Sequence, residues 1–150
     1  MATLRERPYV QFNFLVDMGT GSTDGVEAGF QEVSGLGMEV TIAEYRNGNE
    51  KENSVRKMSA LTKTTDITLK RGIIGSLTLY QWLDQIRNGD QAALRTVVIQ
   101  LQSEDHTASV MTWKLLRARL TKYTGGPLNA KGGDIAMEEM TLSYERMELE

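Results

Sequence analysis

Hydrophobic and polar side chains alternate along several short stretches of the chain, beginning at residues 9–17. There Val10, Phe12, Phe14 and Val16 fall on one face, and with one exception polar side chains take the other. A period of two is typical of a strand that is buried on one face. Comparable stretches predict strands at about 28–34, 38–46, 65–71, 95–103, 108–119 and 135–147. About seven antiparallel strands are therefore expected.

One stretch follows a helical period instead. Its apolar side chains are spaced at i, i+3, i+4 and i+7 and form a single stripe: Leu79, Trp82, Leu83 and Ile86. Thr78 with Gln81 resembles a capping box at its start, and Asn88-Gly89 supplies a stop. The pattern predicts an α-helix at about residues 77–88, packed outside an antiparallel β-sandwich or barrel. With no internal repeat or linker, residues 1–150 are expected to form a single domain.

Residues 47–63 follow neither period. The stretch is polar and begins with Asn47-Gly48, a strong hairpin signal, but no alternating partner strand follows it. We therefore predict an extended loop at about 47–63. Its composition fits a disordered surface loop, and its alternating charges fit an arm that becomes ordered on a neighbouring molecule.

Composition narrows the classes of function. Hydrophobic residues make up 40% and charged residues 25% of the 150 residues, as in a globular domain. The absence of Cys excludes disulfides and thiolate metal sites. A net charge of −3, with both signs dispersed, argues against a dedicated nucleic-acid binder. Neither a signal peptide nor an apolar stretch long enough to span a bilayer is expected.

Candidate chemistry is sparse. The single histidine, His106, lies in a polar turn without a second imidazole. Gly19, Gly21 and Gly25 follow a strand, but neither a periodic helix nor a Gly-Lys-Ser/Thr sequence follows them, so a plain loop is favoured over a phosphate site. The adjacent acids Glu138-Glu139 point to opposite faces of a strand and are interpreted as solvated surface charge. No catalytic, cofactor-binding or metal-binding site is predicted, and no cofactor and no enzyme activity are expected.

The strand around Trp113 is apolar on both faces. Such a strand needs cover on both sides. The predicted helix or a neighbouring subunit could supply the second cover.

Several segments together resemble the phage tail tube protein family. They are Phe30–Leu36 with Glu39, Tyr45–Gly48, Ile67–Ile73, Trp82-Leu83 with Ile86, Trp113–Leu115, Lys122-Tyr123, Pro127–Ala130 and Met137–Glu145. They occur in the family's order from about residue 9 to 147. One departure is the stretch Arg117–Thr121, where the family often has an aromatic-proline segment.

This resemblance implies a structural β-sandwich subunit that forms six-membered rings, stacked into the hollow inner tube of a contractile injection particle. A contracting sheath would drive that tube through a target envelope. The implied partners are further copies of the chain, a sheath protein, baseplate and tube-initiator proteins, and cargo in the lumen, without stable membrane insertion of the subunit. The subunit would be made and assembled in the cytoplasm and end in a tail-like particle, a virion component or one that is released or membrane-anchored.

Two sets of residues are hypothesised to serve this role. The first set would contact the adjacent ring: Arg46, Asn47, Glu50, Lys51, Glu52, Arg56 and Lys57. The second would line the lumen, because alternation places its members on the polar faces of their strands: Glu39, Thr41, Thr68 and Lys70.

Other functions remain open at this point. The tube could belong to a phage tail, an R-type bacteriocin or an injection system, or the chain could be a secreted ring of another secretion machine. Alternatives of other classes are a small β-barrel ligand-binding protein and a β-sandwich hydrolase.

Overall fold

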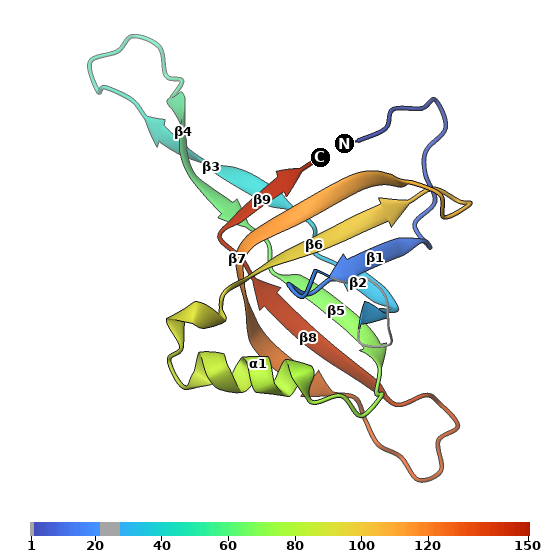
Figure 1. Cartoon of the computed structure of the whole chain (residues 1–150). Helices are drawn as coiled ribbons and strands as arrows, with labels where there is room; N and C mark the ends of the chain where they lie inside the picture. Colours follow the sequence, from blue (N-terminus) through green and yellow to red (C-terminus); the bar gives the residue numbers. More distant parts are fainter. Residues whose placement is uncertain (1, 22–27) are drawn as a thin grey trace.

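The computed structural model describes residues 2–21 and 28–150. Within them the chain is mainly β, with one α-helix beside an antiparallel sheet, as predicted (Figure 1). The strands are β1 (Phe14–Asp17), β2 (Glu32–Ser34), β3 (Met38–Tyr45), β4 (Arg56–Thr64), β5 (Ile67–Gly72), β6 (Arg95–Gln102), β7 (Ser109–Gly125), β8 (Met137–Ser143) and β9 (Arg146–Leu149). The helix α1 spans Thr78–Arg87, and a short 3-10 helix, η2, spans Gln91–Ala93.

Seven strands form one sheet in the order β1-β6-β7-β8-β5-β2, with β9 also paired to β7. Strand β7 is 17 residues long and belongs to both halves of this sheet. It pairs with β6 and β9 along its first part and with β8 from Arg119 onward. Arg117, at φ 52°, lies where the β6–β7 register shifts. A bulge of this kind bends a strand, and β7 curves between the two halves in Figure 1.

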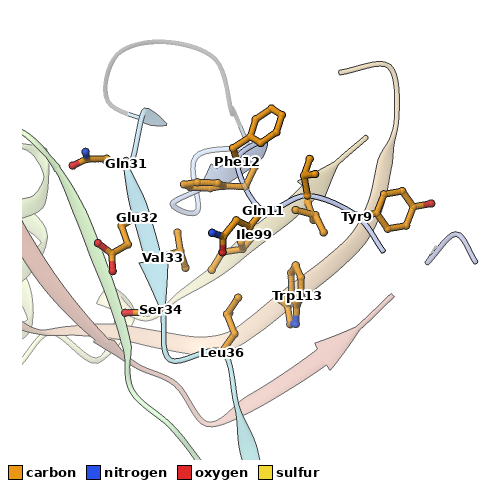
Figure 2. A pocket seen from close by; sticks show the side chains of 13 residues that line it. Tyr9, Gln11, Phe12, Gln31, Glu32, Val33, Ser34, Leu36, Ile99 and Trp113 are labelled. Carbon is orange, nitrogen blue, oxygen red and sulfur yellow. The ribbon is translucent and has the colours of Figure 1, made fainter. Parts of the chain in front are cut away.

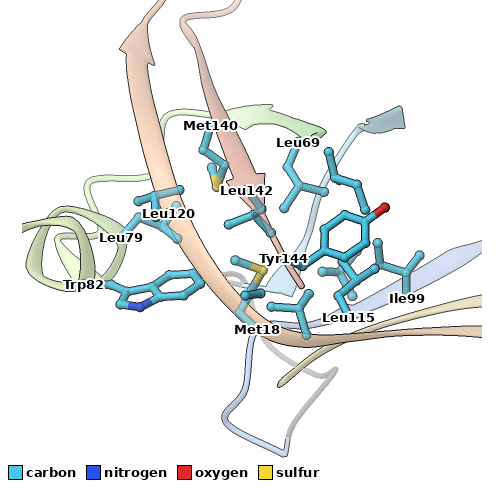
Figure 3. Packing of buried hydrophobic residues seen from close by; sticks show 14 of the residues in the cluster. Met18, Leu69, Leu79, Trp82, Ile99, Leu115, Leu120, Met140, Leu142 and Tyr144 are labelled. Carbon is cyan, nitrogen blue, oxygen red and sulfur yellow. The ribbon is translucent and has the colours of Figure 1, made fainter. Parts of the chain in front are cut away.

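The core lies between the two halves of the sheet. Alternate side chains of the strands point inward (Figure 3). Nine large ones from the strands and Trp82 from the helix are almost completely buried: Ile67, Leu69, Ile99, Leu115, Leu120, Met140, Leu142, Val16 and Val97. Burying each such side chain contributes about 1.5–3 kcal/mol. The alternation that predicted β5, β6 and β8 is therefore the alternation between core and surface.

Helix α1 covers one end of this core. Leu79 and Trp82 are buried and the indole Nε1 donates to the carbonyl oxygen of Ala93 at 2.6 Å, so the predicted stripe faces inward. Gly89, at φ 83°, ends the helix as predicted. The predicted capping box is wrong, because Leu77 occupies the N-cap position and makes no side-chain cap hydrogen bond.

One ion pair is buried among these apolar side chains. The Nε of Arg71 on β5 lies 2.5 Å from Oε1 of Glu138 on β8, and both side chains are at most 5% exposed. The hydroxyl of Tyr123 on β7 donates to the other carboxylate oxygen at 2.5 Å. The prediction that Glu138 and Glu139 face opposite sides is confirmed, but Glu138 is not the solvated surface charge that we predicted.

Several predicted elements have different bounds. The strand predicted at 28–34 is β2, which starts at Glu32, and the one predicted at 108–119 is β7, which continues to Gly125. The first strand starts at Phe14 rather than at residue 9, and the last predicted strand is two strands, β8 and β9, separated by Tyr144-Glu145. The extended loop predicted at 47–63 is wrong from residue 56 onward, where β4 pairs antiparallel with β3. Both faces of β4 are exposed, so burial imposes no period of two on its side chains.

Candidate assembly surfaces

Strands β3 and β4 form a two-stranded hairpin that projects from the sheet (Figure 1). Opposite charges face each other across it, Glu39 beside Lys63 and Glu44 beside Lys57. At its base, the carbonyl oxygen of Gly37 accepts hydrogen bonds from the Tyr144 hydroxyl at 3.0 Å and from the Thr65 amide at 3.1 Å. The main sheet therefore holds the base firmly, while the two strands extend away from it.

The hairpin exposes large hydrophobic side chains. They are between 42% and 81% exposed: Met38, Val40, Ile42, Tyr45, Val55, Met58 and Leu61. A free two-stranded hairpin is marginally stable in water, and exposed apolar clusters of this kind mark interaction sites. The alternation of Met38, Val40 and Ile42 predicted β3 correctly, but the structure leaves this face uncovered.

Polar side chains close the tip of the hairpin. Arg46 donates to the carbonyl oxygens of Glu50 and Glu52, both at 2.9 Å. The Glu50 carboxylate accepts from Asn47 at 3.1 Å and pairs with Arg56 at 3.0 Å. All seven residues hypothesised to contact another ring thus lie in the tip or on the adjoining end of β4: Arg46, Asn47, Glu50, Lys51, Glu52, Arg56 and Lys57. Several of them bind one another and so fix the shape of the tip.

The four residues hypothesised to line a lumen lie in two places. Glu39 and Thr41 are on the hairpin, where the Thr41 hydroxyl donates to the carbonyl oxygen of Leu61 at 2.5 Å. Thr68 and Lys70 are on the outer face of β5, alternating with buried residues. Within one subunit the structure does not bring the two pairs together.

The outer face of the sheet around β5 is polar. Thr68 lies opposite Thr141, and Lys70 lies opposite Glu139. The ammonium of Lys70 is 3.9 Å from the carboxylate of Glu32 on β2. Hydroxyls, charged side chains and this one ion pair therefore cover the face around β5.

A pocket of about 730 Å³ opens between β1 and β2, the two end strands of the sheet order (Figure 2). Tyr9, Phe12 and Phe14 line one side, and Val33 and Leu36 line the other. The remaining wall is half apolar and half polar: Val10, Ile99, Leu101 and Trp113, with Gln11, Gln31, Glu32 and Ser34. Phe12 is 69% exposed at this pocket, which does not fit the half-buried strand predicted there. Sequence reasoning missed the pocket because its walls come from segments far apart in the chain.

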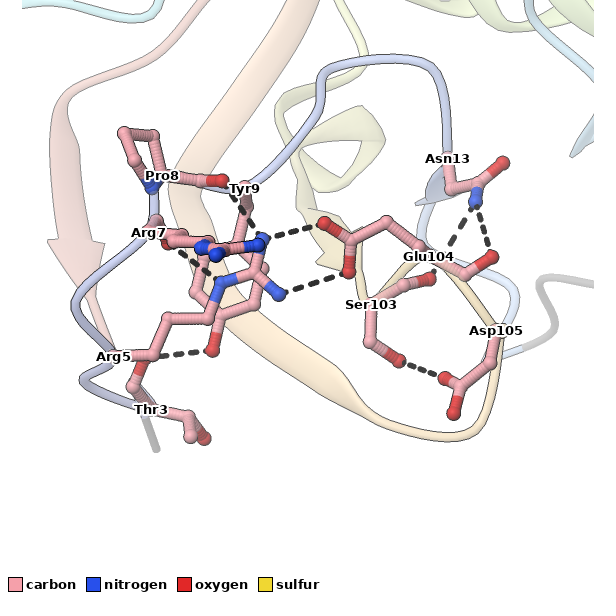
Figure 4. A network of polar contacts seen from close by, with 9 residues as sticks. All are labelled: Thr3, Arg5, Arg7, Pro8, Tyr9, Asn13, Ser103, Glu104 and Asp105. Carbon is pink, nitrogen blue, oxygen red and sulfur yellow. Dashed lines mark hydrogen bonds and ion pairs between the residues drawn. The ribbon is translucent and has the colours of Figure 1, made fainter.

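A polar network holds the segment before this pocket in place (Figure 4). The Arg5 guanidinium donates to both carboxylate oxygens of Glu104, at 2.9 Å and 2.5 Å, and lies 3.7 Å from the ring centroid of Tyr9. The hydrogen bond from Arg5 lowers the pKa of Glu104 below its ordinary value. Next to it, hydrogen bonds from Ser103 and Thr107 lower the pKa of Asp105 to about 2. These contacts fasten residues 3–9 to the turn after β6.

The positions considered above for chemistry contact other residues of their own chain. His106 is exposed at φ 62°, with Nδ1 3.3 Å from the amide oxygen of Gln102. The amides of Gly19, Thr20 and Gly21 donate to the Asp17 carboxylate, so this loop binds an anion of its own chain. Gly25 lies outside the described residues.

Within residues 2–21 and 28–150, no three His, Cys, Asp or Glu side chains are grouped in a way that could hold a metal ion. No helix in that part of the chain is long and apolar enough to cross a membrane.

Comparisons with known proteins agree with this architecture. The chain is similar to a protein in the sheath–tube complex of PVC, an extracellular contractile injection system, in its extended state: 29% identity, TM-score 0.83, over 97% of this chain and 93% of that one. Its fold is also similar to a chain of the anti-feeding prophage cap, at 24% identity and TM-score 0.83 over 100% and 95%. Hcp1 from Flavobacterium johnsoniae has a more distant similarity of fold, at 17% identity and TM-score 0.54 over 91% and 93%.

A search of curated proteins gives no significant match. The family model of the T4-like virus tail tube protein gp19 matches residues 10–148, nearly the whole chain. The family predicted from the ordered segments is thereby confirmed. The chain belongs to the T4-like virus tail tube protein family.

Proposed function

We propose that this tail tube subunit assembles into six-membered rings, which stack into the hollow inner tube of a contractile injection particle. The family match over residues 10–148 carries the proposal. It is supported by the similarity to a protein in the sheath–tube complex of an extracellular contractile injection system. Contraction of a sheath would drive the tube through a target envelope, and the subunit itself would have a structural role without catalysis.

The proposed partners follow from the same relatives. Their structures are those of a sheath–tube complex, a tube-terminating cap, a baseplate and a sheath/tube terminator. We expect this chain to contact its own copies, a sheath protein and the proteins that begin and end the tube. Assembly would take place in the cytoplasm, and the final location would be the particle, with cargo in the lumen.

Two surfaces of the subunit suit this role. The hairpin projects exposed hydrophobic side chains away from its own chain, which is what a contact with another subunit requires. The polar outer face around Thr68 and Lys70 would line the lumen, because cargo slides past a hydrated surface without adhering. A contact between different surfaces of identical chains forms a ring when its rotation closes, and stacking then builds a tube.

Electron microscopy of the purified chain at rising concentration, with native mass measured in parallel, tests the proposal. We expect rings with six-fold symmetry or hollow filaments of uniform width. If no polymer forms alone, a tube-initiator protein is added as a nucleus. A chain that stays monomeric with this nucleus as well would contradict the proposal.

A further inference from the structure

The hairpin and the pocket each have the properties of one side of a subunit interface. Six of the seven exposed hydrophobic side chains of the hairpin lie on strands that pair only with each other, and the seventh, Val55, lies in the tip. The pocket between β1 and β2 is a concave apolar surface on another part of the same chain. A heterologous contact between identical subunits requires two such different and complementary surfaces.

Leu61 on β4 is the most exposed hydrophobic side chain of the hairpin, at 81%. Val40 pairs with Thr62 but Ile42 pairs with Ser59, so β4 has an extra residue beside Thr41. Bulges of this kind redirect a side chain. The bulge is fastened by the hydrogen bond from the Thr41 hydroxyl to the Leu61 carbonyl oxygen. The bulge, held by this hydrogen bond, thus sets the direction of the Leu61 side chain.

The pocket is the right kind of receptor for such a side chain. Figure 2 shows Trp113, Ile99 and Leu36 near one another around its interior. Its volume of about 730 Å³ lies within the range of sites that bury a whole small ligand, so it has room for several side chains. The end strands β1 and β2 stand on either side of it, which leaves room for a segment of another molecule between them.

Charge favours β4 as the occupant. Among the described residues that line the pocket, Glu32 is the one with a formal charge; it is negative and largely exposed, with the ammonium of Lys70 3.9 Å away. Strand β4 carries Arg56, Lys57 and Lys63 and no acidic residue. Complementary charges of this kind select the partner and fix its register.

We infer that the pocket between β1 and β2 receives strand β4 of a second copy of this chain, with Leu61 inserted beside Trp113. This inference rests on the proposed self-assembly and specifies one contact within it. The same insertion would cover the partly buried Trp113, whose strand is apolar on both faces.

Cysteine crosslinking tests the contact, because the natural chain contains no Cys. One chain carries Leu61→Cys and a second carries Gln11→Cys or Gln31→Cys, at exposed positions on the two walls of the pocket. The two chains are mixed, assembled with the tube-initiator protein where needed, and treated with a mild oxidant or a short bis-maleimide. We expect crosslinked dimers for both pocket positions in assembled material.

In the matched control, Leu61→Cys is combined with Leu128→Cys. Leu128 is an exposed apolar residue, like Leu61, but lies away from the pocket. Crosslinks at the pocket positions in excess of this control support the inference. Tubes that form without them overturn the inference and leave the proposed function intact. Failure of the unmodified chain to assemble under any of these conditions overturns both.

A second pair of variants gives an independent measurement. Leu61→Asp should raise the concentration required for assembly at least about ten-fold, because a carboxylate replaces an apolar group in the contact. Leu128→Asp should leave that concentration within about two-fold. The melting temperature of the dilute chain reports whether each variant is folded. Equal effects of the two substitutions on assembly would overturn the inference.

Discussion

Arg71 and Glu138 are charged residues at positions where their neighbours on the same strand faces are apolar. Ile67 and Leu69 precede Arg71 on the inner face of β5, and Met140 follows Glu138 on that of β8. Removing one member of a buried pair leaves a charge without compensation, which makes such pairs sensitive to single substitutions. The hydrogen bond from Tyr123 to Glu138 and burial of the phenol both raise the pKa of Tyr123.

Glu138→Ala should therefore destabilise the fold by about 3–5 kcal/mol. Urea denaturation of the dilute protein measures this loss. Glu139→Ala, one residue further along β8 and exposed, should change the free energy of unfolding by no more than about 0.5 kcal/mol. Similar losses for the two variants would contradict a structural role for the buried pair.

The Arg5–Glu104 contact should respond to acid. The pKa of Glu104 is lowered from its ordinary value of 4.5, so the stabilisation that it provides is complete above pH 4.5. It is lost as the pH falls through the lowered pKa of the folded state, because protonation removes the negative charge that faces Arg5.

NMR chemical shifts of Tyr9, whose ring lies under the Arg5 guanidinium, should report this loss during acid titration. In Glu104→Gln the same signals should already have their low-pH positions at pH 7. A wild-type Tyr9 signal that stays constant below pH 4.5 would argue against the contact.

At the scale of elements, the hairpin depends on a sharp turn of the chain at its base. Gly35 has a φ of 88°, and a Cβ at this position would collide with the carbonyl oxygen of Asp66. Gly35→Ala should destabilise the protein by about 1–3 kcal/mol or more, because it combines backbone strain with the collision. Gly48→Ala in the tip is the control, since a Cβ there has no heavy atom within 4 Å. Thermal unfolding of both variants measures the difference.

The elements that are best predicted from the sequence are those that pack against the hydrophobic core. Strand β5 and helix α1 were found close to their true bounds because burial imposes a period on their side chains. Strand β4 was missed because it is exposed on both faces, although the opposite charges Glu44 and Lys57 marked its register with β3. Of the candidate surfaces, the tip of the hairpin was proposed from its charges, and its contact with another ring stays a prediction. The pocket was not predicted, because no local sequence pattern indicates that segments far apart in the chain lie side by side.

At the scale of the whole molecule, the exposed charges of the hairpin are expected to act between subunits. Arg56→Glu combined with Lys57→Glu should shorten the tubes and make them dissociate at lower salt, because each reversal turns an attraction into a repulsion. Tube length and salt resistance are measured by electron microscopy. Lys122→Glu combined with Lys131→Glu changes the net charge equally at exposed positions outside the hairpin. Tubes of unchanged length and salt resistance in the Arg56/Lys57 variant would remove the tip from the assembly contact.

The continuity of β7 has a mechanical consequence. Because one unbroken strand of 17 residues serves both halves of the sheet, force applied to one half reaches the other through covalent bonds as well as through hydrogen bonds. Sliding of one half past the other would have to distort the backbone of β7, for example at the bulge beside Arg117. A subunit built in this way should yield as one cooperative unit under load, which suits a rod that is pushed from behind.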